Sequence, residues 1–251
     1  PVLRSTCERI AYWHEREDEA GAHVLADLIL EDPLMCWLVL AGSSQRLSGR
    51  LATPVETVTG ALLLTGVESF FRDFCALTEL ETVLDGQPEA LEGALTLVRR
   101  AHSAARLTAA FAIHRQDEDA ELLQQAALLH DSIHLLVWCA APQQALDMAR
   151  RQVVDPNLRS VNVQRDVLGT DLACVTRGLM EIWQMPIALR ELAGERQSSH
   201  GARTVALGVR IARHLESGWH NAALPDDFSD LGLLLNLPQH AAMTLVRRTW
   251  E

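Results

Sequence analysis

The stretch Ala126-Ala127-Leu128-Leu129-His130-Asp131 places a histidine and an aspartate at the end of an apolar run. Apolar residues recur at three- and four-residue steps from residue 119 to residue 138, which predicts one amphipathic helix. An imidazole and a carboxylate on one helical turn are ligands that a divalent metal uses. A hydrolytic metal site also needs further ligands and an open position for water. The pair therefore predicts a helical scaffold of the metal-hydrolase kind.

The same helical spacing continues along the chain, and no alternating stretch is long enough to predict a strand. Helices are expected to begin or end at prolines, glycines and capping residues in these places: Pro33, Gly42, Thr53-Pro54, Gly66, Pro88, Met185-Pro186 and Pro238. Residues 42–52 and 194–201 are expected to be loops, residues 164–183 a helix, and residues 225–227 a turn. We expect about ten helices. The predicted fold class is all-α.

Composition excludes several classes of partner and site. The chain has 251 residues and a formal net charge of −11, and no cluster of five or more basic residues occurs in it. Nucleic acids and anionic membrane surfaces are therefore not expected as partners. Every basic residue is arginine, which excludes Schiff-base chemistry and a P-loop lysine. Five widely spaced cysteines contain no CxxC pair, which favours free thiols in a reducing bacterial cytoplasm.

Several short motifs, in one order, resemble the HDOD family of bacterial signalling domains, which are related to HD-type metal phosphohydrolases. The matching segments span about residues 15 to 215 and are Ile29–Leu34, Val55–Val58, Leu64–Val67, Ala126–Asp131, Leu168–Asp171 and Trp183–Pro186. The resemblance implies one all-α domain over residues 1–251. Its N-terminal helical lobe would comprise about residues 1–87 and pack on an HD-like helical core of residues 88–251.

The resemblance also predicts that the metal site has lost ligands. His102 stands where the first histidine of an HD site is expected, upstream of His130 and Asp131. Val209 stands where a late aspartate is expected, and Leu172 where many HDOD sequences have a histidine. Glu195-Arg196-Gln197 replaces a usual pair of histidines. Three donors do not complete a closed site, so we expect no catalytic residue and no cofactor.

Each candidate residue also has a plainer interpretation. His130 and Asp131 are expected to join neighbouring helices through a hydrogen bond, and His102 to be a core histidine. If the three converge, they would hold Mn, Mg, Fe or Zn weakly. His134 lies four residues after His130, so one helix face would present both rings. Trp183 is expected to be a packing residue.

Three functions remain open at this point. We favour a non-catalytic signalling or output domain that binds a regulatory protein. A sensor of a nucleotide-like anion in the vestigial pocket is the second, with candidate residues Arg99, Arg100, Arg106, Asp171, Arg196 and Arg203. A weakly active metal-dependent phosphohydrolase that uses His102, His130 and Asp131 is the third.

Overall fold

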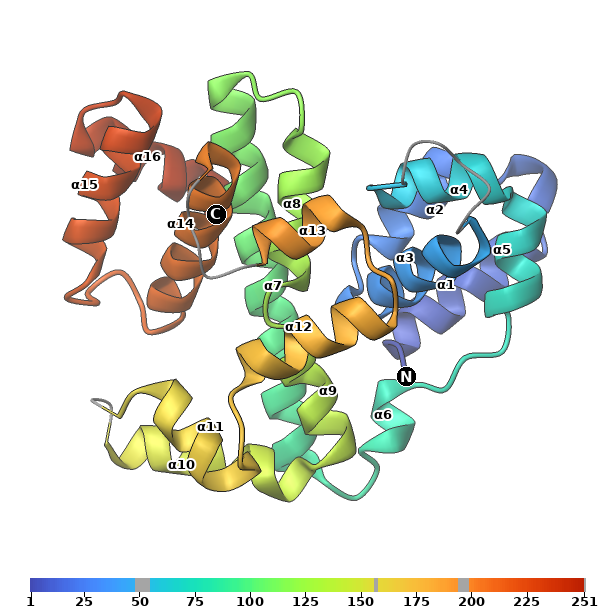
Figure 1. The fold of residues 1–251 in the computed structure, drawn as a ribbon, viewed down its shortest axis with the longest axis horizontal. Coiled ribbons are helices and arrows are strands. Elements are labelled where there is room, and N and C mark those ends of the chain that lie inside the picture. Colours follow the sequence, from blue (N-terminus) through green and yellow to red (C-terminus); the bar gives the residue numbers. More distant parts are fainter. Residues whose placement is uncertain (48–54, 156–157, 194–198, 251) are drawn as a thin grey trace. The chain divides into compact units, whose positions relative to one another are not determined.

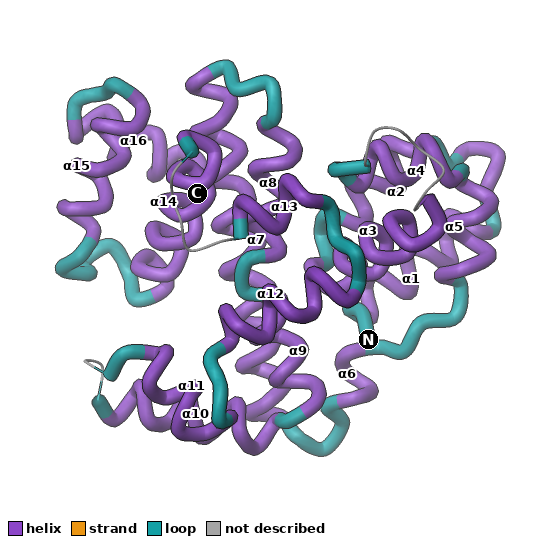
Figure 2. Tube along the Cα trace, viewed as in Figure 1, coloured by secondary structure: helices purple, strands orange, loops and turns teal. Residues whose placement is uncertain are grey.

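The computed structural model describes residues 1–47, 55–155, 158–193 and 199–250. Within these ranges the chain is helical, and its only extended pairing is a single parallel bridge between Val2 and Glu79 (Figure 2). The all-α prediction is confirmed. None of the helices in these ranges combines the length and apolar character that a bilayer crossing requires.

The chain divides into two compact units. Unit 1 comprises Pro1–Val98 and Asp131–Pro186, and unit 2 comprises Arg99–His130 and Ile187–Glu251. This division follows contacts within the chain, and the family-derived lobe boundary after residue 87 stays a prediction.

Unit 1 is built from two runs of helices (Figure 1). The first run comprises α1 (Arg4–His14), the 3-10 turn η1 (Glu17–Glu19), α2 (Ala22–Ile29), α3 (Pro33–Leu47), α4 (Val58–Thr65), α5 (Val67–Phe74), α6 (Leu80–Val83) and the start of α7 (Pro88–Arg115). The second run comprises α9 (Ser132–Ala140), α10 (Pro142–Val154), α11 (Ser160–Leu168) and α12 (Leu172–Ile182).

A buried carboxylate fixes the start of the chain to the α2–α3 junction. Asp32 is fully buried, and one of its oxygens accepts hydrogen bonds from the backbone N–H groups of Leu34 and Met35 at 2.9 and 3.1 Å. The other oxygen accepts from the Leu3 N–H at 2.7 Å and the Thr6 hydroxyl at 2.8 Å. Asp32 therefore caps α3 and holds α1 in place at the same time. Burial raises the pKa of Asp32, and the four hydrogen bonds offset part of that rise.

Unit 2 contains the rest of α7 and five further helices. They are α8 (Ala120–Leu129), α13 (Ile187–Leu192), α14 (His200–Glu216), α15 (Leu224–Leu235) and α16 (Gln239–Trp250). Ser199 caps α14 by accepting a hydrogen bond from the Ala202 N–H at 3.1 Å. Helix α14 passes close to α7 at Gly208, where a Cβ atom would overlap the Thr108 hydroxyl and lie 3.2 Å from the Ala104 carbonyl oxygen. This close approach is why the position needs glycine.

Two expected boundaries in the N-terminal part are wrong. Helix α3 does not stop at Gly42 but continues to Leu47, because Ser43 is buried and Arg46 pairs with Asp73 of α5. Tertiary contacts therefore outweigh the polar sequence of this stretch. Helix α4 begins at Val58 with Thr57 as its cap, four residues after the predicted proline start. The predicted start, Thr53-Pro54, lies outside the described residues.

Four further expectations need correction. The predicted helix 119–138 is two helices, α8 and α9, and the predicted helix 164–183 is divided by Gly169, whose φ of +73° ends α11. Pro225-Asp226-Asp227 is the first turn of α15 and not a separate turn. The loop predicted for residues 194–201 ends at Ser199, and residues 194–198 lie outside the described ranges.

Candidate functional site

His130 and Asp131 occupy a junction between two helices and do not lie inside one helix. His130 is the exposed C-terminal cap of α8, and its N–H donates to the Ala127 carbonyl at 3.3 Å, one residue short of the α-helical pattern. Asp131 is half-buried at the N-cap position of α9, and its side chain makes no capping hydrogen bond. The expectation that both residues lie within one helix is therefore wrong.

The junction has a packing cause. Leu128 and Leu129 at the end of α8 are buried and belong to unit 2, whereas Ile133 and Leu135 at the start of α9 are buried and belong to unit 1. Helix α8 contacts α13 and α14 of unit 2, and α9 contacts α10 and α12 of unit 1. A single straight helix through residues 119–138 would instead place the apolar side chains of both segments along one stripe of its surface.

The remaining predicted ligands lie on other elements. His102 is half-buried on α7 in unit 2, and His134 is half-buried on α9 in unit 1, with its ring stacked against Trp138 at 6.4 Å between centroids. His130 and His134 therefore do not share a helix. Among the described residues, no group of three or more His, Cys, Asp and Glu side chains is placed to hold a metal ion. The metal roles of these residues stay predictions.

Two positions where the family resemblance expects a metal ligand carry buried apolar side chains. Leu172 is the first residue of α12 and is 8% exposed, and Val209 lies in the middle of α14 and is 5% exposed. Neither side chain has a lone pair to offer a metal ion.

Trp37 contacts both Ser132, which follows the His-Asp pair, and Trp183 of the Trp-x-x-Pro segment, and all three residues belong to unit 1. Its indole N–H donates a hydrogen bond to the hydroxyl of Ser132, the first residue of α9. The ring of Trp37 also packs edge-to-face against Trp183, with centroids 5.3 Å apart and planes at 75°. Trp183 is thus a packing residue, as predicted, and Trp37 is its partner.

Asp171 caps a helix. One of its oxygens accepts from the Cys174 N–H at 2.9 Å, and the other pairs with Arg165 at 2.8 Å. The Cys174 hydrogen bond and the Arg165 guanidinium lower the pKa of Asp171. Both carboxylate oxygens are therefore engaged within the chain, and the predicted ligand-binding role of Asp171 remains untested.

The candidate arginines are dispersed over several contacts. Arg100 pairs with Glu216 at 3.2 Å, and Arg106 donates to the Thr249 carbonyl. Arg99 and Arg203 are exposed. Arg196 lies outside the described residues. A cationic pocket built from these side chains stays a prediction.

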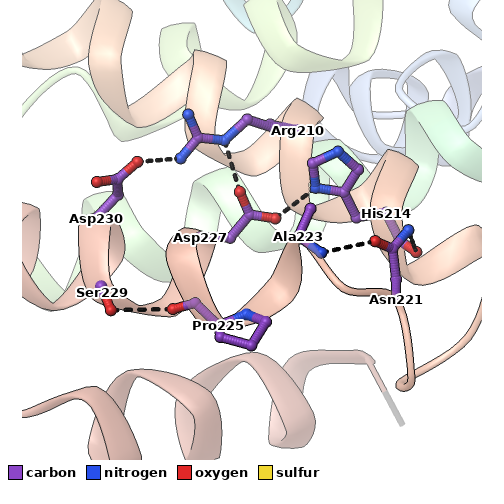
Figure 3. A network of polar contacts seen from close by, with 8 residues as sticks. All are labelled: Arg210, His214, Asn221, Ala223, Pro225, Asp227, Ser229 and Asp230. Atoms are coloured by element: carbon purple, nitrogen blue, oxygen red, sulfur yellow. Dashed lines mark hydrogen bonds and ion pairs between the residues drawn. The ribbon is translucent and has the colours of Figure 1, made fainter. Parts of the chain in front are cut away.

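Sequence analysis missed a charged network between α14 and α15 (Figure 3). Asp227 has a side chain only 3% exposed and pairs with the Arg210 Nε at 2.7 Å and with the His214 Nδ1 at 2.5 Å. Arg210 also pairs with the more exposed Asp230. The second ring nitrogen of His214 points away from Asp227 (Figure 3). Sequence analysis predicted a turn at residues 225–227 and not the start of α15. It therefore had no reason to place Asp227 beside His214 and Arg210, which lie 13 and 17 residues earlier.

A family model for the HDOD domain matches residues 1–199 of the chain. This chain belongs to the HDOD family. The match covers the His-Asp junction, Trp37, Asp171 and Trp183, so each of these features is part of an HDOD domain. No protein with a curated description matches the chain.

Solved structures share this HDOD fold at low sequence identity. The MmoQ response regulator from Methylococcus capsulatus str. Bath is 20% identical, with a TM-score of 0.75 over 98% of this chain and 97% of that chain. A virulence factor from Campylobacter jejuni subsp. jejuni is 17% identical, with a TM-score of 0.69 over 100% and 91% of the two chains. An HDOD domain protein of unknown function from Geobacter sulfurreducens is 15% identical, with a TM-score of 0.52 over 99% and 89%.

Proposed function

We propose that this HDOD chain is a non-catalytic signal-transduction domain that works in the bacterial cytoplasm by binding a regulatory protein. The observation that carries the proposal is the replacement of two expected ligands by the buried side chains of Leu172 and Val209. His102, His130 and Asp131 would then need donors from elsewhere to complete a hydrolytic site.

The distribution of charge supports a protein partner. The sequence of unit 1 holds 22 acidic and 11 arginine side chains, and the sequence of unit 2 holds 11 of each. The whole net charge of −11 therefore belongs to unit 1. Negative charge disfavours the binding of nucleic acids, whose phosphate backbones are also negative. It speeds and orients association with a protein that has a cationic surface.

The two alternatives have less support. A nucleotide sensor would need arginines that are available to an anion, whereas Arg100 and Arg106 are engaged with Glu216 and with the Thr249 carbonyl. A phosphohydrolase would need His130 and Asp131 to act from a helix junction together with donors that sequence analysis did not identify.

A turnover experiment tests the proposal. The purified chain is incubated with added Mn²⁺ or Mg²⁺ and with bis(p-nitrophenyl) phosphate or a cyclic dinucleotide, beside the His130→Ala and Asp131→Ala variants. His114→Ala, which removes an exposed histidine at the end of α7, is the matched control. We expect the same background rate from all four proteins. Hydrolysis that both junction variants abolish and the control retains would refute the non-catalytic function.

A further inference from the structure

The short helix α4 has no charged side chain, and only one side of it is buried. Its sequence, Val58-Thr59-Gly60-Ala61-Leu62-Leu63-Leu64-Thr65, contains no charged residue. Val58, Ala61 and Leu62 are buried where α4 packs with α2, α3 and α5. Leu63 and Leu64 are 65% and 53% exposed. Two neighbouring exposed leucines on a helix without charged residues are typical of a helix with a further neighbour.

The N-terminal segment that contains α4 has a large net negative charge. Residues 1–98 hold 16 acidic and 6 arginine side chains, a net charge of −10. Asp27 on α2 and Glu68 on α5 are exposed carboxylates of helices that pack with α4. Arg46 and Arg72, the described arginines of α3 and α5, both pair with Asp73. The carboxylate of Asp73 therefore offsets part of the positive charge of these two arginines.

Charge selects the kind of molecule that can cover this side. Anionic lipids and nucleic acids have the same sign of charge as residues 1–98 and are repelled. A second copy of the chain, placed symmetrically, would bring two regions of net charge −10 together. A protein surface that combines apolar and cationic side chains meets both requirements.

We infer that the exposed side of α4, formed by Leu63 and Leu64 and called the α4 face, docks a cationic amphipathic helix of another protein. Such a helix presents apolar side chains at three- and four-residue steps, which suits two neighbouring exposed leucines. Its arginines or lysines would flank the apolar contact and be attracted by the net negative charge of residues 1–98. The inference rests on the proposed function, because it names the chemistry of the protein partner.

Another exposed apolar pair in unit 1 supplies a matched control. Val153 and Val154, at the end of α10, are 80% and 86% exposed. They follow Arg150 and Arg151, and the segment 150–165 holds four arginines and one aspartate. A cationic helix has no electrostatic reason to bind there. Changes to this pair remove a similar apolar area without touching the α4 face.

Two synthetic helical peptides with the same leucine stripe serve as probes, one with arginine and one with glutamate on the polar side. Fluorescence anisotropy measures the affinity of the full chain for each at low salt. We expect the arginine peptide to bind at least about 10-fold more tightly than the glutamate peptide. Leu63→Ser/Leu64→Ser should weaken it about 10-fold, which corresponds to about 1.4 kcal/mol, whereas Val153→Ser/Val154→Ser should leave it unchanged.

Several outcomes would overturn the α4 face. If the valine and leucine variants lose affinity for the arginine peptide equally, or if neither loses any, the peptide is attracted by the overall negative charge and not by the α4 face. A concentration-dependent dimer in sedimentation runs, dissolved by the leucine change, would assign the face to a second copy. Thermal melts of both variants show that they are folded. None of these results affects the proposed function. That proposal is refuted only by hydrolysis that the His130→Ala and Asp131→Ala variants abolish.

Discussion

The buried carboxylate of Asp32 allows a sharp test of how the N-terminal part of unit 1 is held together. In Asp32→Ala, α3 loses its cap, and the Leu3 N–H and Thr6 hydroxyl lose their acceptor in a fully buried place. In Asp32→Asn, the amide oxygen still accepts from the first turn of α3. The amide NH₂ then faces the Leu3 N–H, which is also a donor.

The magnitudes follow from these contacts. Loss of the cap costs about 1 kcal/mol, and each buried donor left without an acceptor costs about 1–3 kcal/mol. Because two donors lose their acceptor, Asp32→Ala is expected to lower the free energy of unfolding by about 3–7 kcal/mol. Asp32→Asn keeps the cap and removes the cost of burying a charge, so we expect a loss of about 1–2 kcal/mol.

Urea unfolding followed by circular dichroism at pH 7 measures both variants. Asp27→Ala and Asp27→Asn, on the exposed side of α2, are the matched controls and should stay within about 0.5 kcal/mol of the parent chain. A loss below about 0.5 kcal/mol for Asp32→Ala would refute the reasoning. So would an asparagine variant as unstable as the alanine variant, because the cap would then contribute nothing.

Three further predictions concern single contacts. The Cys174 N–H and the Arg165 guanidinium lower the pKa of Asp171 in the folded chain, so its stabilising effect is present at neutral pH and lost as the pH falls through the folded pKa. Asp171→Asn should therefore lower the melting temperature at pH 7, and this difference from the parent chain should shrink as the pH is lowered. Gly208→Ala should cost about 1–3 kcal/mol in urea unfolding by forcing α14 away from α7, and adding Thr108→Ala should recover part of that loss; strict additivity would contradict the contact. Asp227→Ala leaves an arginine and a histidine without their shared carboxylate and should cost about 3 kcal/mol, while an unchanged unfolding midpoint would show that the network is not stabilising.

The helices that sequence analysis placed well are those whose ends are set by local chemistry. Pro33, Pro88 and Met185-Pro186 mark helix starts, and Gly66, with a φ of +84°, ends α4 where the sequence predicts a break. Proline fixes its own φ, and glycine adopts a positive φ that other residues rarely reach. Such boundaries need no knowledge of the rest of the fold.

The boundaries that were missed depend on contacts between distant segments. Arg46 keeps the end of α3 helical through Asp73, 27 residues later. The break at His130 appears only when the apolar sides of α8 and α9 are assigned to different units. Asp227 shows the same limit, since an acidic residue after a proline has the pattern of an exposed turn and only the packing of α15 on α14 buries it.

The motif residues that identify the family have clear packing roles in unit 1. Asp32, in the Ile29–Leu34 segment, caps α3 and anchors Leu3. One turn later Trp37 donates to Ser132, the residue that follows the His-Asp pair, and packs against Trp183 of the Trp-x-x-Pro segment. A chain that lost hydrolysis would still need these contacts in order to fold. The order of HDOD motifs can therefore persist for structural reasons, whereas Leu172, where the family resemblance predicts a ligand, is a buried apolar residue.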